Sequence, residues 1–199
     1  MSLILASTSA SRRAMLRAAG VPHDAVAPGL DEEEAKLALA AEGVSEAGAV
    51  AAALAGNKAL RISLRFPDAL VLGADQVLET QDGVLLDKPV DLTAAASQLR
   101  ALRGRTHRLI AAAALARKGV IVWRAHDSAA MTMRAFGDAF LDRYLAIAGA
   151  DVLGSVGGYL IEGLGAQLFD AVAGDHYTIR GLPMWQLLAE LRARRILAV

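Results

Sequence analysis

The sequence predicts an α/β protein with a mixed, partly antiparallel sheet, and three observations lead to this prediction. Apolar runs of strand length alternate with segments of helical spacing along the chain. Hydrophobic residues make up 55% of the 199 residues and aromatic residues only 5%, a composition that favours helices packed closely on a sheet. A turn signal, Gln81-Asp82-Gly83, separates two short apolar runs and predicts an antiparallel hairpin.

The elements follow from local patterns in chain order. Apolar runs bounded by turn residues give the expected strands, which are residues 2–5, 23–27, 69–72, 76–79, 84–86, 108–116 and 120–133. Helical composition and spacing give the expected helices, which are residues 11–19, 31–41, 44–64, 92–102, 138–148 and 183–195. We expect Gly20 to end the first helix, and Gly73-Ala74-Asp75 to end the strand 69–72. Because no repeat, linker or domain boundary is visible, we expect residues 1–199 to form a single domain.

The composition also excludes several classes of function. Lys+Arg and Asp+Glu are 21 each, and a net charge of zero argues against broad nucleic-acid binding. The absence of cysteine removes disulfides, thiol nucleophiles and cysteine-bound zinc. No uncharged run approaches the ~18 residues of a membrane span and no signal peptide is evident, so we expect a cytoplasmic protein with no membrane partner. The four histidines are scattered, which disfavours a histidine metal centre.

The segment LASTSASRRAML runs from a strand through a hydroxyl-rich turn into a helix that opens with two arginines. A helix N-terminus carries partial positive charge, so Arg12 and Arg13 are unfavourable there unless an anion binds. Free backbone N–H groups and the hydroxyls of Ser7, Ser9 and Ser11 can supply an anion site. The guanidinium of Arg12 has the planar fork that suits phosphate. Simple capping of the helix by Ser9 or Ser11 is the alternative.

Four further residues are candidates for chemistry. Asp75 directly follows a buried apolar strand, where open α/β sheets place their ligands, although a turn-forming aspartate is equally consistent. Lys88 precedes a rigid proline, and Lys58 lies on an expected helix; a surface lysine is the alternative for both. Glu32 belongs to an acidic run at a helix start, which the helix dipole alone explains, but it can also serve as a metal ligand.

The chain resembles the Maf family of nucleoside triphosphate pyrophosphatases. The resemblance rests on six segments in order: LASTSASRRAML, GADQV, LLDKP, GRTH, SVGGYLIEGLG and GLPM. It implies a two-lobed α/β fold, Maf/ITPase-like, around an extended mixed β-sheet with flanking helices, and a nucleotide cleft between the lobes. It also implies hydrolysis of a non-standard or surplus nucleoside triphosphate to monophosphate and pyrophosphate with a divalent metal, and a homodimer.

The resemblance also implies roles for single residues. Asp75 matches the family's proton acceptor, and Glu32 matches an acidic residue of the same cleft. The positions that match its phosphate-binding residues are Ser7, Ser9, Arg12, Lys58 and Lys88. We expect Arg13, beside Arg12, to bind phosphate too. Glu32 and Asp75 suit Mg²⁺ or Mn²⁺, because Mg²⁺ needs only one or two carboxylates in addition to phosphate oxygens.

The preferred base stays open between two branches of the family. Gln76 and Glu162 look like the branch that acts on 7-methyl-GTP, whereas Ser11 fits neither that branch nor the branch acting on dTTP and UTP. Ala10 stands where the family usually has proline. The alternative function is a non-catalytic, nucleotide-binding regulator of cell division or septum formation, which would need the phosphate loop but not Asp75.

Overall fold

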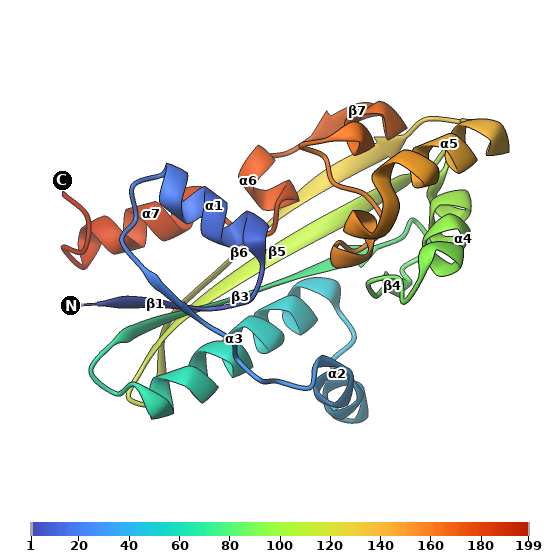
Figure 1. Cartoon of the computed structure of the whole chain (residues 1–199). Coiled ribbons are helices and arrows are strands. Elements are labelled where there is room, and N and C mark those ends of the chain that lie inside the picture. The colour runs from blue at the N-terminus through green and yellow to red at the C-terminus, as the bar shows by residue number, and fades with distance from the viewer. Residues whose placement is uncertain (1, 199) are drawn as a thin grey trace. The chain divides into compact units, whose positions relative to one another are not determined.

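The structure is a computed structural model that describes residues 2–198 (Figure 1). Its strands are β1 Leu3–Ala6, β2 Asp24–Val26, β3 Leu70–Glu79, β4 Leu85–Leu86, β5 Thr106–Arg117, β6 Val120–Met133 and β7 Phe169–Ala173. Its α-helices are α1 Ala10–Ala18, α2 Glu32–Ala41, α3 Ala47–Arg65, α4 Leu92–Leu102, α5 Asp138–Ala148, α6 His176–Ile179 and α7 Met184–Ala193. Two 3₁₀ helices span Gly149–Gly154 and Leu164–Leu168.

The strands form one mixed sheet in the order β2-β1-β3-β5-β6-β7, with β4 paired to β3. Strand β1 runs parallel to both β2 and β3, whereas the β3–β4 and β6–β7 pairs are antiparallel. The β3–β4 hairpin turns at Gly83, which has a positive φ of 79°. The α/β class, the mixed sheet and the predicted hairpin are therefore confirmed.

One expectation about the strands is wrong. Residues 69–72 and 76–79 are not two strands separated by a break at Gly73-Ala74-Asp75, but one continuous strand, β3. The strand continues because Ala74, Val77 and Leu78 are all buried, so the apolar surface extends past the glycine. Two elements were also not predicted: β7 is mostly exposed, and α6 has only four residues, too few to show a helical period.

The chain divides into two compact units, and three of the four boundaries between them fall inside strands. The first unit contains residues up to Gln76, Ile110–Asp127 and residues from His176 onward. The second contains Val77–Leu109 and Ser128–Asp175. The single domain over residues 1–199 stays a prediction.

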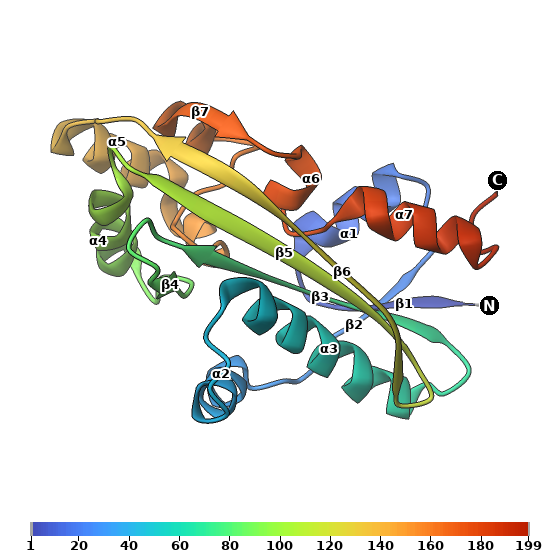
Figure 2. The same ribbon diagram turned by 180° about the vertical axis from the view of Figure 1, so that it is seen from behind.

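The first unit has a core on one face of its strands. Helices α1 and α7 cover this face, and α3 covers the opposite face (Figures 1 and 2). The core joins Leu16 of α1 and Leu187 of α7 to Leu5 of β1, Leu72 of β3 and Leu115 of β5, all fully buried. No helix among the described residues has the length and apolar character needed to cross a membrane.

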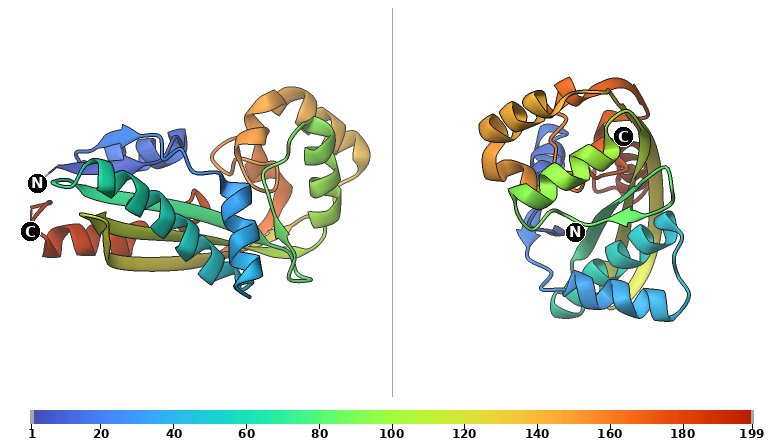
Figure 3. Two further views of the ribbon diagram at one scale, coloured as in Figure 1. Left: turned by 90° about the horizontal axis from the view of Figure 1, so that it is seen from below. Right: turned by 90° about the vertical axis from the view of Figure 1, so that its right-hand side faces the viewer.

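The second unit packs α4 against α5 (Figure 3) and encloses a small aromatic cluster. The ring of His107 lies against Tyr159 and Phe169, and His107 Nε2 is 2.6 Å from Tyr159 Oη. Burial lowers the pKa of His107 to about 4. The GRTH motif therefore contributes a neutral, buried histidine to this unit.

Candidate active site

The geometry of the site begins with a glycine that lets a helix touch the sheet. A Cβ on Gly73 would lie 2.0 Å from the carbonyl oxygen of Ala55 and 2.7 Å from the amide nitrogen of Ala59. No other residue fits there, so the backbone of α3 lies directly against β3. This contact carries Lys58, next to Ala59 on α3, to a place beside Asp75, two residues beyond Gly73 on β3.

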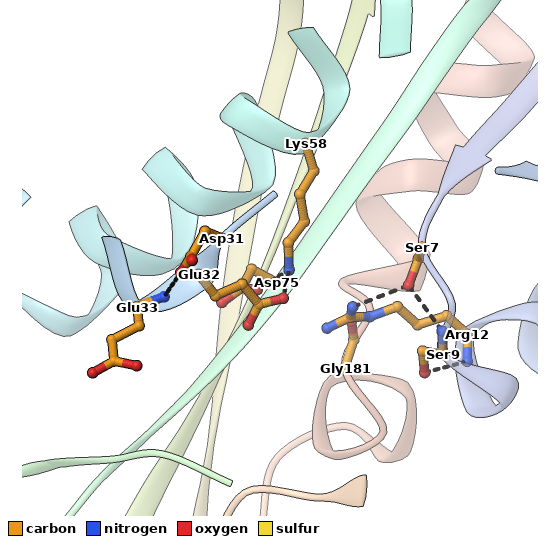
Figure 4. Close-up of polar contacts among 9 residues, drawn as sticks. All are labelled: Ser7, Ser9, Arg12, Asp31, Glu32, Glu33, Lys58, Asp75 and Gly181. Atoms are coloured by element: carbon orange, nitrogen blue, oxygen red, sulfur yellow. Dashed lines mark hydrogen bonds and ion pairs between the residues drawn. The ribbon is translucent and has the colours of Figure 1, made fainter. Parts of the chain in front are cut away.

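Lys58 joins two carboxylates, and the three form what we call the Glu32–Lys58–Asp75 cluster (Figure 4). Lys58 Nζ lies 2.5 Å from Asp75 Oδ1 and 2.7 Å from Glu32 Oε1. The side chains of Lys58 and Asp75 are only 5% and 6% exposed, whereas that of Glu32 is 44% exposed. A buried charge is stable only when it is paired, and this pairing is why an aspartate occurs inside a buried strand.

Helix α2 supplies the exposed member of the cluster. Asp31 caps this helix by accepting hydrogen bonds from the backbone N–H groups of Glu33 and Glu34. The helix dipole favours acidic residues in this first turn. Glu32 is the first residue of α2 and points to Lys58 rather than only to solvent, so it has a second role that the dipole does not explain.

Asp75 lies where a neighbouring strand ends. Strands β1 and β3 are in register with Ala6 opposite Gly73, and β1 ends at this pair while β3 continues. The prediction that Asp75 lies at the carboxyl end of its own strand is wrong. Asp75 lies inside β3, just beyond the carboxyl end of the parallel strand β1. Ligands of open α/β sheets bind in this kind of place.

The turn after β1 carries the basic side of the site. Ser9 caps α1 by accepting a hydrogen bond from the backbone N–H of Arg12 at 3.3 Å, and its role in phosphate binding stays a prediction. Ser7 Oγ accepts from the backbone N–H of Ser9 at 3.2 Å and from Arg12 Nη1 at 3.4 Å. The hydroxyl-rich turn thus fixes the start of the helix and the side chain of its first arginine.

Arg12 is held on one edge and open on the other. Its Nε donates to the carbonyl oxygen of Gly181 at 3.0 Å, and the guanidinium points toward Asp75 (Figure 4). Burial lowers the pKa of Arg12, whereas the nearby negative charges of Asp75 and Glu32 raise it. A guanidinium has five N–H donors, and the contacts of Arg12 with Ser7 and Gly181 use two of them. The remaining donors suit an anionic ligand.

Gln76, next to Asp75, contacts the protein rather than open space. Successive residues of a strand point to opposite faces, so Gln76 faces away from α3. Its Nε2 donates to the carbonyl oxygens of Thr178 at 3.0 Å and Ile179 at 2.9 Å, at the end of α6. Sequence reasoning missed this contact, because backbone acceptors leave no signal in the side-chain pattern.

The other predicted residues lie on α1 and in the second unit. Arg13 is one residue further along α1 and so is turned by about 100° from Arg12. Ser11 is half-buried in the first turn of α1 and does not cap it. Lys88 and Glu162 are exposed residues of the second unit. The roles predicted for these residues stay predictions.

The described residues include two carboxylates bridged by a lysine, next to a turn that carries an arginine. Both features lie on the mixed sheet of an α/β fold. The family model described as Maf-like protein matches residues 2–194. This chain therefore belongs to the Maf-like protein family.

Relatives match this chain from end to end. A protein of Granulibacter bethesdensis named nucleoside triphosphate pyrophosphatase is 44% identical over 199 residues, covering 100% of both chains. One of the same name from Rhodospirillum rubrum is 48% identical, covering 98% of this chain and 96% of its own. A protein of Mesorhizobium japonicum named 7-methyl-GTP pyrophosphatase is 49% identical, covering 96% and 94%.

A solved structure was also matched at a lower level. It is a nucleoside-triphosphatase (dITP/XTP pyrophosphatase) of Mycobacterium abscessus, 16% identical, with a TM-score of 0.46 and coverage of 98% of this chain and 96% of its own. A likeness this low supports no statement about fold or activity.

Proposed function

We propose that the Glu32–Lys58–Asp75 cluster is the hydrolytic centre of a nucleoside triphosphate pyrophosphatase. The class of activity, hydrolysis of a phosphoanhydride bond, follows from membership of the Maf-like family and from relatives of that name over the whole chain. The observation that supports this location best is the contact of one buried ammonium with two carboxylates, beside Arg12.

Asp75 is the proposed proton acceptor. The oxygen of a water molecule forms a bond to the α-phosphorus, and the bond from that phosphorus to the oxygen shared with the β-phosphate breaks. Asp75 takes the proton of the water, and pyrophosphate leaves. Lys58 holds the carboxylate of Asp75 in one orientation through its 2.5 Å contact. The proton acceptor is therefore already oriented before the reaction begins.

Arg12 is the proposed ligand of the phosphates, together with the turn of Ser7 and Ser9. Its open donors and its positive charge suit phosphate oxygens, and the turn adds the N-terminus of α1. Arg13 and Lys88 are part of the proposal on the strength of the sequence alone. The proposed determinants of the base are Ser11, Gln76 and Glu162; the candidate bases remain 7-methylguanine and a pyrimidine.

The carboxylates of Glu32 and Asp75 fit a divalent metal such as Mg²⁺ or Mn²⁺. Lys58 Nζ contacts one oxygen of each carboxylate, so the metal would be held beside the ammonium and not in its place. Within residues 2–198 no group of three or more acidic, histidine or cysteine side chains forms a complete metal cage. Mg²⁺ suits such a partial set, because it takes the rest of its ligands from phosphate and water. When bound, it would neutralise charge on the leaving pyrophosphate.

The remaining parts of the proposal concern partners and place. A nucleoside triphosphate is the substrate. The net charge of zero argues against nucleic acid as a partner. A homodimer and a cytoplasmic location rest on the resemblance and on the sequence alone.

Product analysis tests the proposed reaction. We expect the purified protein to convert a nucleoside triphosphate to monophosphate and pyrophosphate with no diphosphate. The reason is that the proposed phosphate ligands and the metal stabilise the pyrophosphate as it leaves. Chromatography of the nucleotides with an enzymatic pyrophosphate assay measures this. Diphosphate with orthophosphate would identify an ordinary phosphatase, and no turnover of any triphosphate would favour a non-catalytic nucleotide-binding regulator.

Chelation tests the proposed metal. We expect turnover to be abolished in excess chelator and restored by Mg²⁺ or Mn²⁺, since the protein cations near Asp75 do not balance a whole triphosphate. The measurement is pyrophosphate release against free metal concentration, with Ca²⁺ as a comparison ion. Full activity in excess chelator would remove the metal from the mechanism.

A further inference from the structure

Glu162, one of the proposed determinants of the base, lies in the segment SVGGYLIEGLG, residues 155–165. We call this segment the 155–165 loop. It consists of bends and turns followed by the start of the second 3₁₀ helix. Because no strand or long helix holds the loop, its place depends on contacts with the elements around it. Those contacts lie within the second unit.

Two glycines let the first half of the loop pack closely on its surroundings. Gly157 and Gly158 have positive φ values of +81° and +72°, a conformation that L side chains rarely adopt. A Cβ on Gly157 would lie 2.6 Å from Cδ1 of Leu78 on β3. A Cβ on Gly158 would lie 3.4 Å from Cβ of Ala95 on α4. The hydroxyl of Tyr144 on α5 donates to the carbonyl oxygen of Gly158 at 3.2 Å, so three elements contact this half of the loop.

Tyr159 anchors the middle of the loop. Its side chain is buried, and its ring lies edge-on to Phe169, with 4.8 Å between the ring centroids. Its hydroxyl oxygen lies 2.6 Å from Nε2 of His107 on β5. Burial raises the pKa of Tyr159 and lowers the pKa of His107 to about 4. Both side chains are therefore uncharged at neutral pH, and the hydrogen bond joins two neutral partners.

The hydrogen bond to Tyr159 gives a reason for a histidine at position 107. His107 is buried, and its Nδ1 has no hydrogen-bond partner among residues 2–198. A buried nitrogen without a partner costs free energy, and an apolar side chain at this position would avoid that cost. The polar contact that His107 does make is directed at the loop, through Nε2 and the hydroxyl of Tyr159.

The turn that carries Glu162 begins at the residue after Tyr159. The backbone N–H of Gly163 donates to the carbonyl oxygen of Leu160 at 3.2 Å, which closes a four-residue turn with Glu162 in its third position. Gly165 packs on the same carbonyl, because a Cβ there would lie 2.5 Å from the oxygen of Leu160. The turn is therefore compact, and its entry point is fixed by Tyr159.

We propose that His107 and Tyr159 are positioning residues for Glu162, and that their hydrogen bond sets how well the protein distinguishes one nucleobase from another. The inference rests on the proposed function in one respect, namely that Glu162 is a determinant of the base. A carboxylate distinguishes bases by accepting from their N–H groups, and such hydrogen bonds depend on orientation. A loop that loses its anchor presents Glu162 in several orientations, so discrimination between bases decreases.

Nucleotides that cannot be hydrolysed test this role by binding alone. The probes are the α,β-methylene analogues of 7-methyl-GTP and dTTP, with dissociation constants measured by titration calorimetry in the presence of Mg²⁺. The test variant is Tyr159→Phe, which removes the hydroxyl and keeps the ring. Tyr177→Phe is the matched control, because it makes the same change in the first unit, at a tyrosine whose ring contacts Trp185. Glu162→Ala gives the ratio of the two constants without the carboxylate.

We expect Tyr159→Phe to change the ratio of the two dissociation constants by about threefold to tenfold toward the ratio of Glu162→Ala, the effect of one buried hydrogen bond. Tyr177→Phe should keep the wild-type ratio. In the Glu162→Ala background, Tyr159→Phe should have little further effect on the ratio. The dissociation constant of inorganic tripolyphosphate, which has no base, should stay unchanged, because Tyr159→Phe alters no proposed phosphate ligand.

Two results would overturn the inference. One is an unchanged ratio in folded Tyr159→Phe although Glu162→Ala changes it. The other is weaker binding of both analogues and of tripolyphosphate by one common factor, which would mean that the hydrogen bond only supports the fold. If Tyr159→Phe does not fold, His107→Phe removes the same hydrogen bond, keeps a ring, and is judged by the same ratio. Failure of the proposed hydrolysis shows separately, as wild-type protein that binds the analogues but releases no pyrophosphate from any triphosphate.

Discussion

Replacement of Asp75 by asparagine is expected to lower kcat by about 10²–10⁴-fold, the range in which a general base contributes. Asparagine keeps the shape of the side chain and can still accept the hydrogen bond from Lys58, but it cannot take a proton. KM should change less, because the proposed phosphate ligands, Arg12, Ser7 and Ser9, are not altered. Steady-state kinetics on the best triphosphate, with pyrophosphate as the readout, measures both constants.

Asp82→Asn is the matched control for this variant. It makes the same chemical change in an exposed ion pair, in which Asp82 Oδ2 lies 2.8 Å from Arg105 Nη1 and the aspartate side chain is 68% exposed. Exposed pairs contribute little, so its kinetics should match the wild type. A folded Asp75→Asn enzyme with near-normal kcat would eliminate Asp75 as the base.

Replacement of Lys58 by methionine is expected to destabilise the fold by roughly 3 kcal/mol, because removing one partner of a buried ion pair leaves an uncompensated charge. The carboxylate of Asp75 would lose its ammonium in a position where it is 6% exposed, and it would then face Glu32 with no cation between them. Methionine fills most of the volume of the lysine stem. The decrease in the free energy of unfolding therefore measures the loss of the charge and not the creation of a cavity. Urea unfolding followed by circular dichroism gives the free energy.

The control for this prediction is a second substitution. Lys58→Met combined with Asp75→Asn removes both charges, so the double variant should be more stable than Lys58→Met alone. Stability of the single variant within about 0.5 kcal/mol of the wild type, the usual range for surface changes, would contradict the role given to Lys58.

The fold could be predicted largely from the sequence because most of its elements carry a local signal. The helices at 92–102 and 138–148 form with the expected bounds, since their apolar spacing and flanking residues define both ends. The course of β3 was misjudged at Asp75, because an acid in a buried strand looks like the end of that strand. The ion pair with Lys58, 17 residues earlier in the chain, allows the buried strand to contain Asp75. No local sequence pattern shows that pairing.

The candidate site was predicted as a set of residues but not as an arrangement. Glu32, Lys58 and Asp75 were each named, yet their common contact depends on the approach of α3 to β3. Ser9 was named for phosphate and for capping, and the structure shows the cap. The contacts of Arg12 and Gln76 with the turn after α6 could not be foreseen, because their acceptors are backbone carbonyls next to a four-residue helix.

The contact at Gly73 has a consequence for how this site can change. Lys58 and Asp75 come from a helix and a strand whose backbones touch, so the spacing of the pair is set by the missing Cβ and not by a loop. Every side chain larger than hydrogen at position 73 would separate helix from strand, and the loss of the pair would come together with the loss of packing. A substitution at Gly73 therefore disturbs the acid, its lysine and the packing of α3 on β3 together.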